Sequence, residues 1–401
     1  MTTAVQKWLG FSTTRMHFRG RAGGGMPAVV VSACRLRRAV ATHPPLMHPF
    51  RFGSLGRALL ALLPLIGFSA AIMESPTLQW TRLPVLPDAE GFASAFAGAS
   101  HGALLVAGGA NFPGKRPWEG GTKTWYDEVF VLTSAKEGWH VGGKLPRPNA
   151  YGVSFTTPAG VVCAGGGDAR EHLRDVFLLA WEQGRLNTKS LPALPGPMAF
   201  GSGAAEGSQV YLFGGITRPD ATTALATFLT MDMSAAAPAW KELPPCPGPA
   251  RMLAQVGMIG SEFFVCGGVS LSAGPDGKAV RTYLHDAYAY SPAKGWRKLA
   301  DMPHAIAAAP SPMPVAPTGE LLVISGDDGQ RGHLIGPNHP GFPQDVLAYD
   351  ARRDTWRKAG EAPISRATAP TAFWNGSWIV ASGEKKPGYR TNEVWALRYS
   401  P

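Results

Sequence analysis

Ala103-Leu104-Leu105-Val106-Ala107-Gly108-Gly109 is a short apolar run that ends in two glycines, and the chain repeats this arrangement six times. The six turns are Gly108-Gly109, Gly165-Gly166, Gly214-Gly215, Gly267-Gly268, Ser325-Gly326 and Ser382-Gly383. Successive turns lie about 50 to 60 residues apart. A fixed period of this length is typical of a repeat architecture in which each repeat is one structural unit.

Each repeat carries the same parts in the same order. After the glycine turn comes a variable loop, and then an acidic or amide residue that leads an alternating strand, at Asp127, Asp175, Asp286, Asp345 and Asn392. A tryptophan then marks the last strand in four of the repeats, at Trp139, Trp240, Trp296 and Trp356. With the small apolar strand that opens the next repeat, this makes four strands per period, the pattern of a kelch-type propeller blade.

The two ends of the chain complement each other. The sixth repeat stops at Arg398-Tyr399 without a tryptophan strand, whereas a spare one, Gln79-Trp80-Thr81-Arg82-Leu83-Pro84, precedes the first repeat. The sequence therefore predicts an all-β fold, a six-bladed kelch-type β-propeller over residues 76–401. We expect the strand around Trp80 to complete the last blade, because a ring closed by both ends leaves no open edge.

Residues 1–73 differ in composition from the repeats. They contain nine Lys and Arg and no acidic residue, so the net charge of +10 arises in this leader, and the remaining chain has 29 basic against 28 acidic residues. A charge confined to a leader does not indicate nucleic-acid binding, and we expect none. Residues 1–46 fit no element, and Met47 is an alternative start.

Residues 47–73 have the layout of a secretory signal peptide. Two arginines precede the apolar run 58–68, and the small residues 69–71 supply a cleavage site. The run is short for a membrane span, so we expect export to the periplasm or beyond, with no stable membrane insertion after cleavage. An uncleaved anchor is the alternative, and Val31-Ser32-Ala33-Cys34 has a weaker likeness to a lipoprotein signal.

The loops at one end of the blades are expected to carry the site. In a four-stranded blade, the loop after the second strand lies on the same face as the link to the next blade, and such loops carry specificity in propellers. These segments are rich in Arg with interspersed carboxylates, which predicts a small anionic ligand. For most of these arginines a solvated loop or an ion pair between blades is the alternative. No His and Cys cluster has metal-site spacing, which disfavours an oxidase.

Three segments resemble the N-acetylneuraminate epimerase (sialic acid mutarotase) family. They are Ser382-Gly383-Glu384-Lys385-Lys386-Pro387-Gly388-Tyr389-Arg390-Thr391-Asn392-Glu393-Val394, Gly108-Gly109-Ala110-Asn111-Phe112-Pro113-Gly114-Lys115-Arg116, and Arg147-Pro148-Asn149-Ala150-Tyr151-Gly152-Val153-Ser154. In the better-known members the first of these precedes the other two, whereas here it comes last. The chain therefore resembles a cyclically permuted branch of that family.

The resemblance implies an isomerase that interconverts the α and β anomers of N-acetylneuraminate, a small anionic sugar, by general acid–base ring opening and closure. It implies that Glu384 is the proton acceptor and that Arg390 contacts the sugar acid. Further candidates for substrate binding at the same mouth are Asn111, Arg147, Asn149, Tyr151 and Arg366. The chemistry requires no metal, nucleotide or redox cofactor, and we expect none. The alternative for Glu384 and Arg390 is a structural ion pair across a tight loop.

A hypothesis from a different class also remains open. A non-catalytic exported kelch module that binds glycan or protein predicts a weakly charged mouth and an exposed apolar patch. The enzyme hypothesis predicts a narrow polar pocket that contains Glu384. The link Pro363–Pro370 matches the better-known epimerases poorly, so another sugar acid or sugar hemiacetal is an alternative substrate.

Overall fold

The structure is a computed structural model that describes residues 77–334 and 336–400. The leader 1–46 and the predicted signal peptide 47–73 lie outside these residues. The described chain consists of strands and loops with two short 3-10 turns, η2 (Pro117–Glu119) and η3 (Gly336–Asn338). Neither turn has the length that a helix needs to cross a bilayer.

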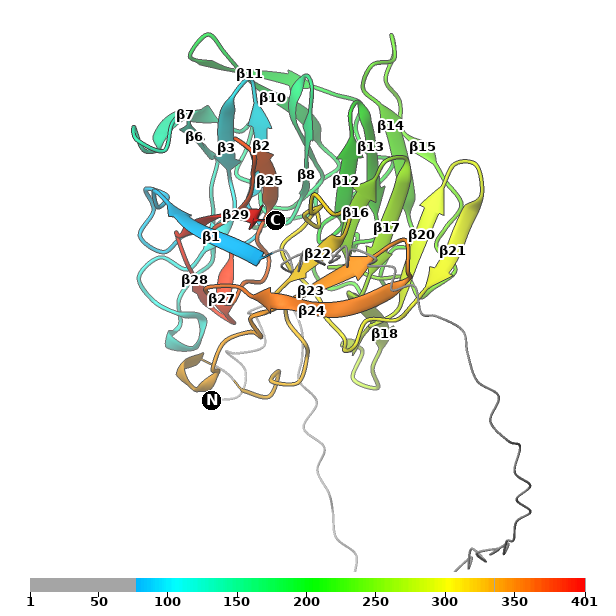
Figure 1. The fold of residues 1–401 in the computed structure, drawn as a ribbon. Coiled ribbons are helices and arrows are strands. Elements are labelled where there is room, and N and C mark those ends of the chain that lie inside the picture. The colour runs from blue at the N-terminus through cyan, green and yellow to red at the C-terminus, as the bar shows by residue number, and fades with distance from the viewer. Residues whose placement is uncertain (1–76, 335, 401) are drawn as a thin grey trace, which may run out of the picture. The chain divides into compact units, whose positions relative to one another are not determined.

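Six antiparallel sheets of the described residues are the blades of a propeller, and three further two-stranded hairpins lie outside the blades (Figure 1). Blade 1 contains β2 (Phe96–Ser100), β3 (Ala103–Ala107), β6 (Glu128–Leu132) and β7 (His140–Lys144). Blade 2 contains β8 (Val153–Thr157), β9 (Gly160–Ala164), β10 (Val176–Glu182) and β11 (Arg185–Ser190). Blade 3 contains β12 (Ser202–Glu206), β13 (Gln209–Phe213), β14 (Phe228–Asp232) and β15 (Lys241–Glu242). Blade 4 contains β16 (Gln255–Ile259), β17 (Glu262–Cys266), β20 (Ala287–Ser291) and β21 (Gly295–Leu299). Blade 5 contains β22 (Leu321–Ile324), β23 (Asp345–Asp350) and β24 (Thr355–Glu361). Blade 6 contains β25 (Thr371–Trp374), β26 (Ser377–Ala381), β29 (Val394–Ser400) and β1 (Thr77–Leu83). The predicted six-bladed β-propeller is confirmed.

The ring closes through the two ends of the described chain. β1 pairs antiparallel with β29 over its whole length, from Thr77 opposite Ser400 to Leu83 opposite Val394. Trp80 lies opposite Leu397 in this register. The strand around Trp80 is thus the outermost strand of the last blade, as the sequence predicted.

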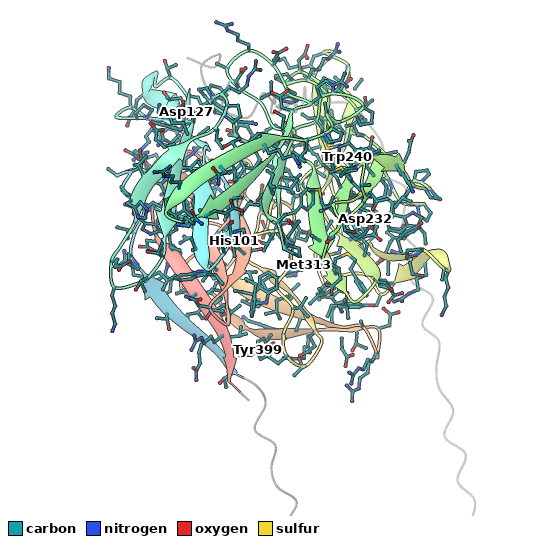
Figure 2. The ribbon with its side chains drawn as sticks, turned by 90° about the horizontal axis from the view of Figure 1, so that it is seen from above. His101, Asp127, Asp232, Trp240, Met313 and Tyr399 are labelled. Carbon is teal, nitrogen blue, oxygen red and sulfur yellow. The ribbon has the colours of Figure 1, made fainter. Side chains whose placement is uncertain are left out.

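Blade 5 departs from the predicted four strands. Its sheet contains three, and the segment 309–315, which should supply the innermost strand, is irregular. Pro310, Pro312 and Pro314 alternate along this segment, and proline cannot donate to a sheet ladder. Met313 instead donates its N–H to Val256 of blade 4 at 2.6 Å. Its side chain is buried and lies near the middle of the view in Figure 2.

Apolar side chains fill the six interfaces between neighbouring blades. Between blades 1 and 2, for example, Leu105 and Val131 pack with Val161 and Leu179. Equivalent clusters lie at the other five interfaces, including the one between blade 6 and blade 1. Burying one such side chain contributes about 1.5–3 kcal/mol relative to leaving it exposed. Every blade is covered on both faces because the ring is closed.

The glycine turns join neighbouring blades by backbone hydrogen bonds. Gly109 donates its N–H to the carbonyl of Asn149, in the link to the next blade, at 2.8 Å. In each of the remaining five turns the second glycine makes the equivalent bond. These glycines are Gly166, Gly215, Gly268, Gly326 and Gly383. The next blade approaches so closely that a Cβ on Gly214 would lie 2.2 Å from the carbonyl oxygen of Arg251, and Gly214 also has a φ of +64°. This approach is the physical reason for the Gly-Gly repeat.

Two of the six turns begin with serine instead of glycine. Ser325 and Ser382 adopt φ values of +56° and +58°, which are strained for a residue with a side chain. Their hydroxyls compensate by bonding to the next blade. The N–H of Arg366 donates to Ser325 Oγ, and the N–H of Phe92 donates to Ser382 Oγ, each at 2.7 Å. The Ser-Gly turns therefore carry one polar contact between blades that a glycine could not make.

A closed ring of six backbone hydrogen bonds lies inside the propeller. One residue from each link between blades donates its N–H to the carbonyl of the equivalent residue one blade earlier, with N–O distances of 2.7 to 3.1 Å. In chain order the six residues are Ser94, Tyr151, Phe200, Leu253, Ala308 and Thr368, and the bond from Ser94 to Thr368 closes the ring. All six have positive φ, between 50° and 66°. We call this set the hydrogen-bond ring.

Tryptophans near the outer edge link the blades a second time. Each indole N–H donates to a carbonyl that follows the outermost strand of the preceding blade: Trp139 to Pro84, Trp240 to Pro192, Trp296 to Pro244 and Trp356 to Ala300, at 2.7 to 2.9 Å. Blade 6 differs, because the buried Nε1 of Trp80 has no hydrogen-bond partner among the described residues. Five blades contain this tryptophan, and in four of them its N–H donates a hydrogen bond to the preceding blade.

We expect Trp356→Phe to lower the free energy of unfolding by about 1 kcal/mol more than Trp80→Phe, because only Trp356 loses a hydrogen bond. Both side chains are partly buried, so the loss of apolar surface is similar in the two variants. Urea unfolding followed by tryptophan fluorescence and circular dichroism measures both. Equal losses of stability in the two variants would contradict the role assigned to the indole N–H.

Candidate active site

The residue that follows each glycine turn has the same place in every blade. It pairs, backbone to backbone, with the residue just before the hydrogen-bond ring: Ala110 with Ala93, Gly167 with Ala150, Ile216 with Ala199, Val269 with Met252, Asp327 with Ala307, and Glu384 with Ala367. Four of these positions carry Ala, Gly, Ile or Val. The two acidic ones, Asp327 and Glu384, belong to the neighbouring blades 5 and 6.

Both carboxylates line one cavity, which we call the mouth cavity. It encloses about 480 Å³ of empty space, part of which is open to solvent. Residues of the hydrogen-bond ring line it, among them Phe200 and Thr368. Its other polar lining residues are Arg281 and Tyr283. The mouth cavity therefore combines apolar walls with two carboxylates, a guanidinium and a phenol.

Glu384 and Arg390 face each other across a short hairpin. β27 (Glu384–Lys386) pairs with β28 (Tyr389–Arg390), and Pro387-Gly388 forms the turn, where Gly388 has a φ of +82° as the third residue of a type II turn requires. The guanidinium lies 2.8 Å from the carboxylate, and the side chains are only 1% and 3% exposed. The structural ion pair considered for these two residues is thus present. It also places a charged carboxylate in the mouth cavity.

The surroundings of Glu384 change its proton affinity. Burial raises the pKa of its carboxyl, while Arg390 and Lys123 lower it and Asp327 raises it. The net pKa lies above the ordinary value for glutamate. A carboxyl of this kind changes its charge closer to neutral pH than an exposed glutamate, which suits a catalytic base.

Lys123 belongs to the site although the sequence analysis did not single it out. It precedes β5 (Thr124–Trp125), which pairs with β4 (Ala110–Asn111) in a hairpin of blade 1. Its ammonium lies 5.0, 5.5 and 5.7 Å from the ring centroids of Tyr151, Trp125 and Phe112. Arg390 lies 4.9 Å from the same Phe112 ring. Aromatic faces thus hold both cations that act on Glu384.

Asp327 is held by a hairpin from blade 4 that the sequence analysis also missed. β18 (Val269–Ala273) and β19 (Ala279–Tyr283) pair through a turn around Pro275-Asp276-Gly277, whose turn chemistry was readable in the sequence. The Tyr283 hydroxyl donates to Asp327 at 2.6 Å. Burial and the neighbouring Asp327 raise the pKa of Tyr283, which keeps the phenol protonated.

The two asparagines predicted to bind substrate make contacts within the framework. Asn111 donates to the carbonyl of Gly91 at 3.0 Å and accepts from Tyr126 at 2.8 Å. Asn149 donates to the carbonyl of Gly165 at 2.9 Å and accepts from the N–H of Gly167 at 2.9 Å. Both are buried and neither is a lining residue of the mouth cavity. Their predicted contact with substrate stays a prediction.

The other three predicted substrate-binding residues lie in different surroundings. Arg147 is 45% exposed and forms ion pairs at 3.7 to 3.9 Å with Asp168, Glu171 and Asp175 of the next blade. Arg366 is buried and lies 3.8 Å from Glu393, and burial lowers its pKa to about 9. Tyr151 belongs to the hydrogen-bond ring, and its buried hydroxyl has no hydrogen-bond partner among the described residues. Of the three, Tyr151 is the one in contact with the site, through Lys123.

The described part of the chain contains no group of three His, Cys, Asp or Glu residues placed to hold a metal ion. The three cysteines in it, Cys163, Cys246 and Cys266, are all free. Burial raises the pKa of the Cys163 and Cys266 thiols, so these two act as small apolar residues in the cores.

Comparison with known proteins identifies related enzymes. Residues 67–188 match the family model described as N-acetylneuraminate epimerase. N-acetylneuraminate epimerases of Yersinia pestis (strain Pestoides F) and Brucella suis are each 37% identical to the chain, over 137 and 128 residues. These matches cover 29% and 28% of this chain and 33% and 32% of the relatives, so the chain spans about a third of the length of the curated relatives it matches.

A solved structure described as "Structure of YjhT" superposes with a TM-score of 0.59, covering 80% of this chain and 99% of that chain at 17% identity. At this identity the likeness shows the propeller fold. Two of the three motif segments, around Asn111 and Asn149, lie within the residues that match the family model, whereas Glu384 and Arg390 lie outside them. The resemblance to the N-acetylneuraminate epimerase family is thereby confirmed.

Proposed function

We propose that this chain is a mutarotase that interconverts the α and β anomers of N-acetylneuraminate. The observation that carries the proposal is the buried carboxylate of Glu384, held 2.8 Å from Arg390 at the edge of the mouth cavity. The names of the related epimerases support the substrate. The proposed location is the periplasm or the outside of the cell, and it rests on the signal-peptide layout of residues 47–73.

The chemistry needs one positioned base and one proton donor. In the closed sugar, the anomeric carbon carries a hydroxyl and the ring oxygen. Glu384 takes the proton of the anomeric hydroxyl as the bond between the anomeric carbon and the ring oxygen breaks, and the ring oxygen is protonated. Rotation about the neighbouring carbon–carbon bond presents the other face of the ketone, and reclosure gives the other anomer. General acid–base catalysis of this kind contributes about 10²–10⁴-fold in rate.

Arg390 has two tasks in this scheme. Its charge lowers the pKa of Glu384 and so favours the ionised base over the protonated acid. A guanidinium carries donors along more than one edge, which suits contact with Glu384 and with the carboxylate of the sugar acid at once. The guanidinium carbon of Arg390 lies 4.9 Å from the centroid of the Phe112 ring, and this cation–π contact helps to hold the guanidinium in place. Arg390 is itself 1% exposed and is not a lining residue of the mouth cavity, so in this scheme it reaches the sugar acid from behind Glu384, and the sugar lies in the cavity with its anomeric centre beside the base.

The charged lining favours an enzyme over a non-catalytic binding module. A module that docks on protein needs an exposed apolar patch. The large apolar side chains that the structure describes as exposed are Val85, Val141, Val280 and Phe373. Val141, Val280 and Phe373 come from three different strands and Val85 from the link after β1, and none of the four lines the mouth cavity. The buried carboxylate is a feature that a base requires and a docking surface does not.

We expect Glu384→Gln to lower kcat/KM for mutarotation by about 10²–10⁴-fold, because glutamine cannot accept the proton. The measurement is NMR of freshly released α-N-acetylneuraminate, with the spontaneous rate in buffer subtracted. Glu242→Gln, in the exposed outer strand β15, is the matched control and should retain the wild-type rate. A wild-type protein no faster than buffer would refute the mutarotase, and a fully active Glu384→Gln variant would refute the base.

We expect Lys123→Met to shift the acid limb of the pH–rate profile to higher pH. Glu384 works as the ionised form, so activity is lost as pH falls through its raised pKa, and removing a cation that lowers this pKa raises it further. Lys115→Met, an exposed lysine of the same loop, should leave the limb in place. Profiles of kcat/KM between pH 4 and 9, at constant ionic strength, measure the shift. An unchanged limb in Lys123→Met would contradict the electrostatic role of Lys123.

A further inference from the structure

We propose that Arg281 binds the carboxylate of the sugar acid and thereby gives the mouth cavity its preference for an anionic sugar. The inference rests on the proposed function, because it names the group that recognises the charged end of the substrate while Glu384 acts at the anomeric centre. It adds a substrate-binding residue from a hairpin of blade 4 to the Glu384–Arg390 pair of blade 6.

The β18–β19 hairpin presents Arg281 to the mouth cavity. Successive side chains of a strand point to opposite faces, and β19 follows this alternation. Val280 and Thr282 are exposed, whereas Arg281 and Tyr283 are partly buried. Arg281 and Tyr283 both line the mouth cavity. The hairpin therefore turns one face toward solvent and a polar face, with a guanidinium and a phenol, toward the cavity.

Arg281 is the one cation among the described residues that line the mouth cavity. Arg390 and Lys123 act on Glu384 without being lining residues. An anion that enters the cavity therefore meets the guanidinium of Arg281 at the wall, whereas the other two cations lie behind the wall. A planar guanidinium matches the two oxygens of a carboxylate with two parallel N–H donors, and its five donors allow it to keep a protein neighbour at the same time.

The charges around the mouth cavity favour one additional negative charge. Two carboxylates, Asp327 and Glu384, line it, and three cations act on them, namely Arg281, Arg390 and Lys123. With both carboxylates ionised, this set has one positive charge in excess. Buried charges need partners of opposite sign because burial removes the water that would otherwise stabilise them. A sugar with a single carboxylate completes the balance, and a neutral sugar does not.

Asp327 and Tyr283 support the charge of Arg281. Burial lowers the pKa of the guanidinium, and Tyr283 and Asp327 oppose this change. Asp327 accepts from the Tyr283 hydroxyl at 2.6 Å through Oδ2 and from the Gly329 N–H at 3.0 Å through Oδ1, as a carboxylate does. The ionised Asp327 is thus a positioning residue for Arg281. This role explains why an acidic residue lies beside a site for an anion.

The experiment compares Arg281→Met with Arg218→Met. Arg218 follows the third glycine turn, is exposed, pairs with Asp220 and does not line the mouth cavity, so its variant should bind as wild type does. The ligand is the methyl α-glycoside of N-acetylneuraminate, whose locked anomeric centre prevents turnover, and calorimetry gives the Kd. We expect Arg281→Met to raise this Kd about 10²-fold, because a charge-assisted pair of hydrogen bonds is lost.

The methyl ester of the same glycoside separates recognition of the carboxylate from a general effect on the fold. Esterification removes the negative charge and leaves the rest of the sugar unchanged. Wild type should bind the ester about 10²-fold more weakly than the acid, whereas Arg281→Met should lose most of this preference. If Arg281 has only a structural role, the variant keeps the preference for the acid, and that result would overturn the inference.

The kinetic constants give a second readout. In the NMR exchange assay we expect Arg281→Met to raise KM about 10²-fold with little change in kcat, because the carboxylate is held equally in the ground state and the transition state. Glu384→Gln, in contrast, should lower kcat. A variant of Arg281 that lowers kcat with an unchanged KM would contradict a role in binding the carboxylate.

The outcomes distinguish this inference from the proposed function. If wild type exceeds buffer and Arg281→Met keeps the wild-type Kd, KM and preference for the acid, the inference falls and the mutarotase stands. If wild type binds the acid through Arg281 but does not exceed buffer, the mutarotase falls and the anion site stands. If wild type neither binds the acid nor exceeds buffer, both fall.

A second variant decides if Arg281→Met does not fold, as thermal unfolding would show. Arg281→Lys keeps the charge and loses the planar fork of donors, so we expect the Kd for the acid to rise about tenfold. The Kd for the methyl ester should stay close to that of wild type. A wild-type Kd for the acid in Arg281→Lys would overturn the inference.

Discussion

The hydrogen-bond ring is the constraint on which the rest of the propeller depends. Its six members each hold a left-handed backbone conformation, which costs about 1–2 kcal/mol for a residue other than glycine. The cost is offset because each member donates to one blade and accepts from another. A ring of such bonds closes only with all six blades in place. The residue two positions upstream of each member then receives the bond from a glycine turn, and the residue one position upstream pairs with the position that carries Asp327 and Glu384.

The position that follows each glycine turn carries a carboxylate in two blades and a small or apolar residue in the other four. Arg251 and Arg366, which each lie two residues before a ring member, serve the framework instead. Arg251 is fully buried and forms two hydrogen bonds to Asp286, at 2.6 and 2.8 Å. Arg366 lies 3.8 Å from the carboxylate of Glu393 and donates to its backbone carbonyl at 3.4 Å. Arg251 and Arg366 thus form contacts within the framework of the propeller and not with the mouth cavity.

The sequence predicted the fold well because the framework repeats. Six matched turns and the spare strand around Trp80 were sufficient to deduce the blades and the closure, and the prolines of 309–315 explain the one missing strand. The Glu384–Arg390 hairpin was predictable because both residues lie in one short segment. Lys123 and Tyr283 were not, because they come from other blades through loops whose length varies. The repeat defines where such a loop begins and ends, but it does not determine which side chain reaches the mouth cavity. The buried position of Arg366 was hidden for a similar reason, since side-chain direction does not follow from position in the repeat.

Closure by β1 and β29 ties the completeness of the chain to the completeness of the site. β29 follows directly after the hairpin that holds Glu384 and Arg390, and it pairs on its outer side with β1. During synthesis the first strand of the propeller to emerge therefore has no partner until the last one is made. The turn that precedes Glu384 bonds to Phe92, near the other end of the described chain, so this contact forms only when the two ends of the propeller have met. Assembly of the site therefore depends on the whole ring. A shortened chain loses the charged mouth cavity even where most of its blades can form.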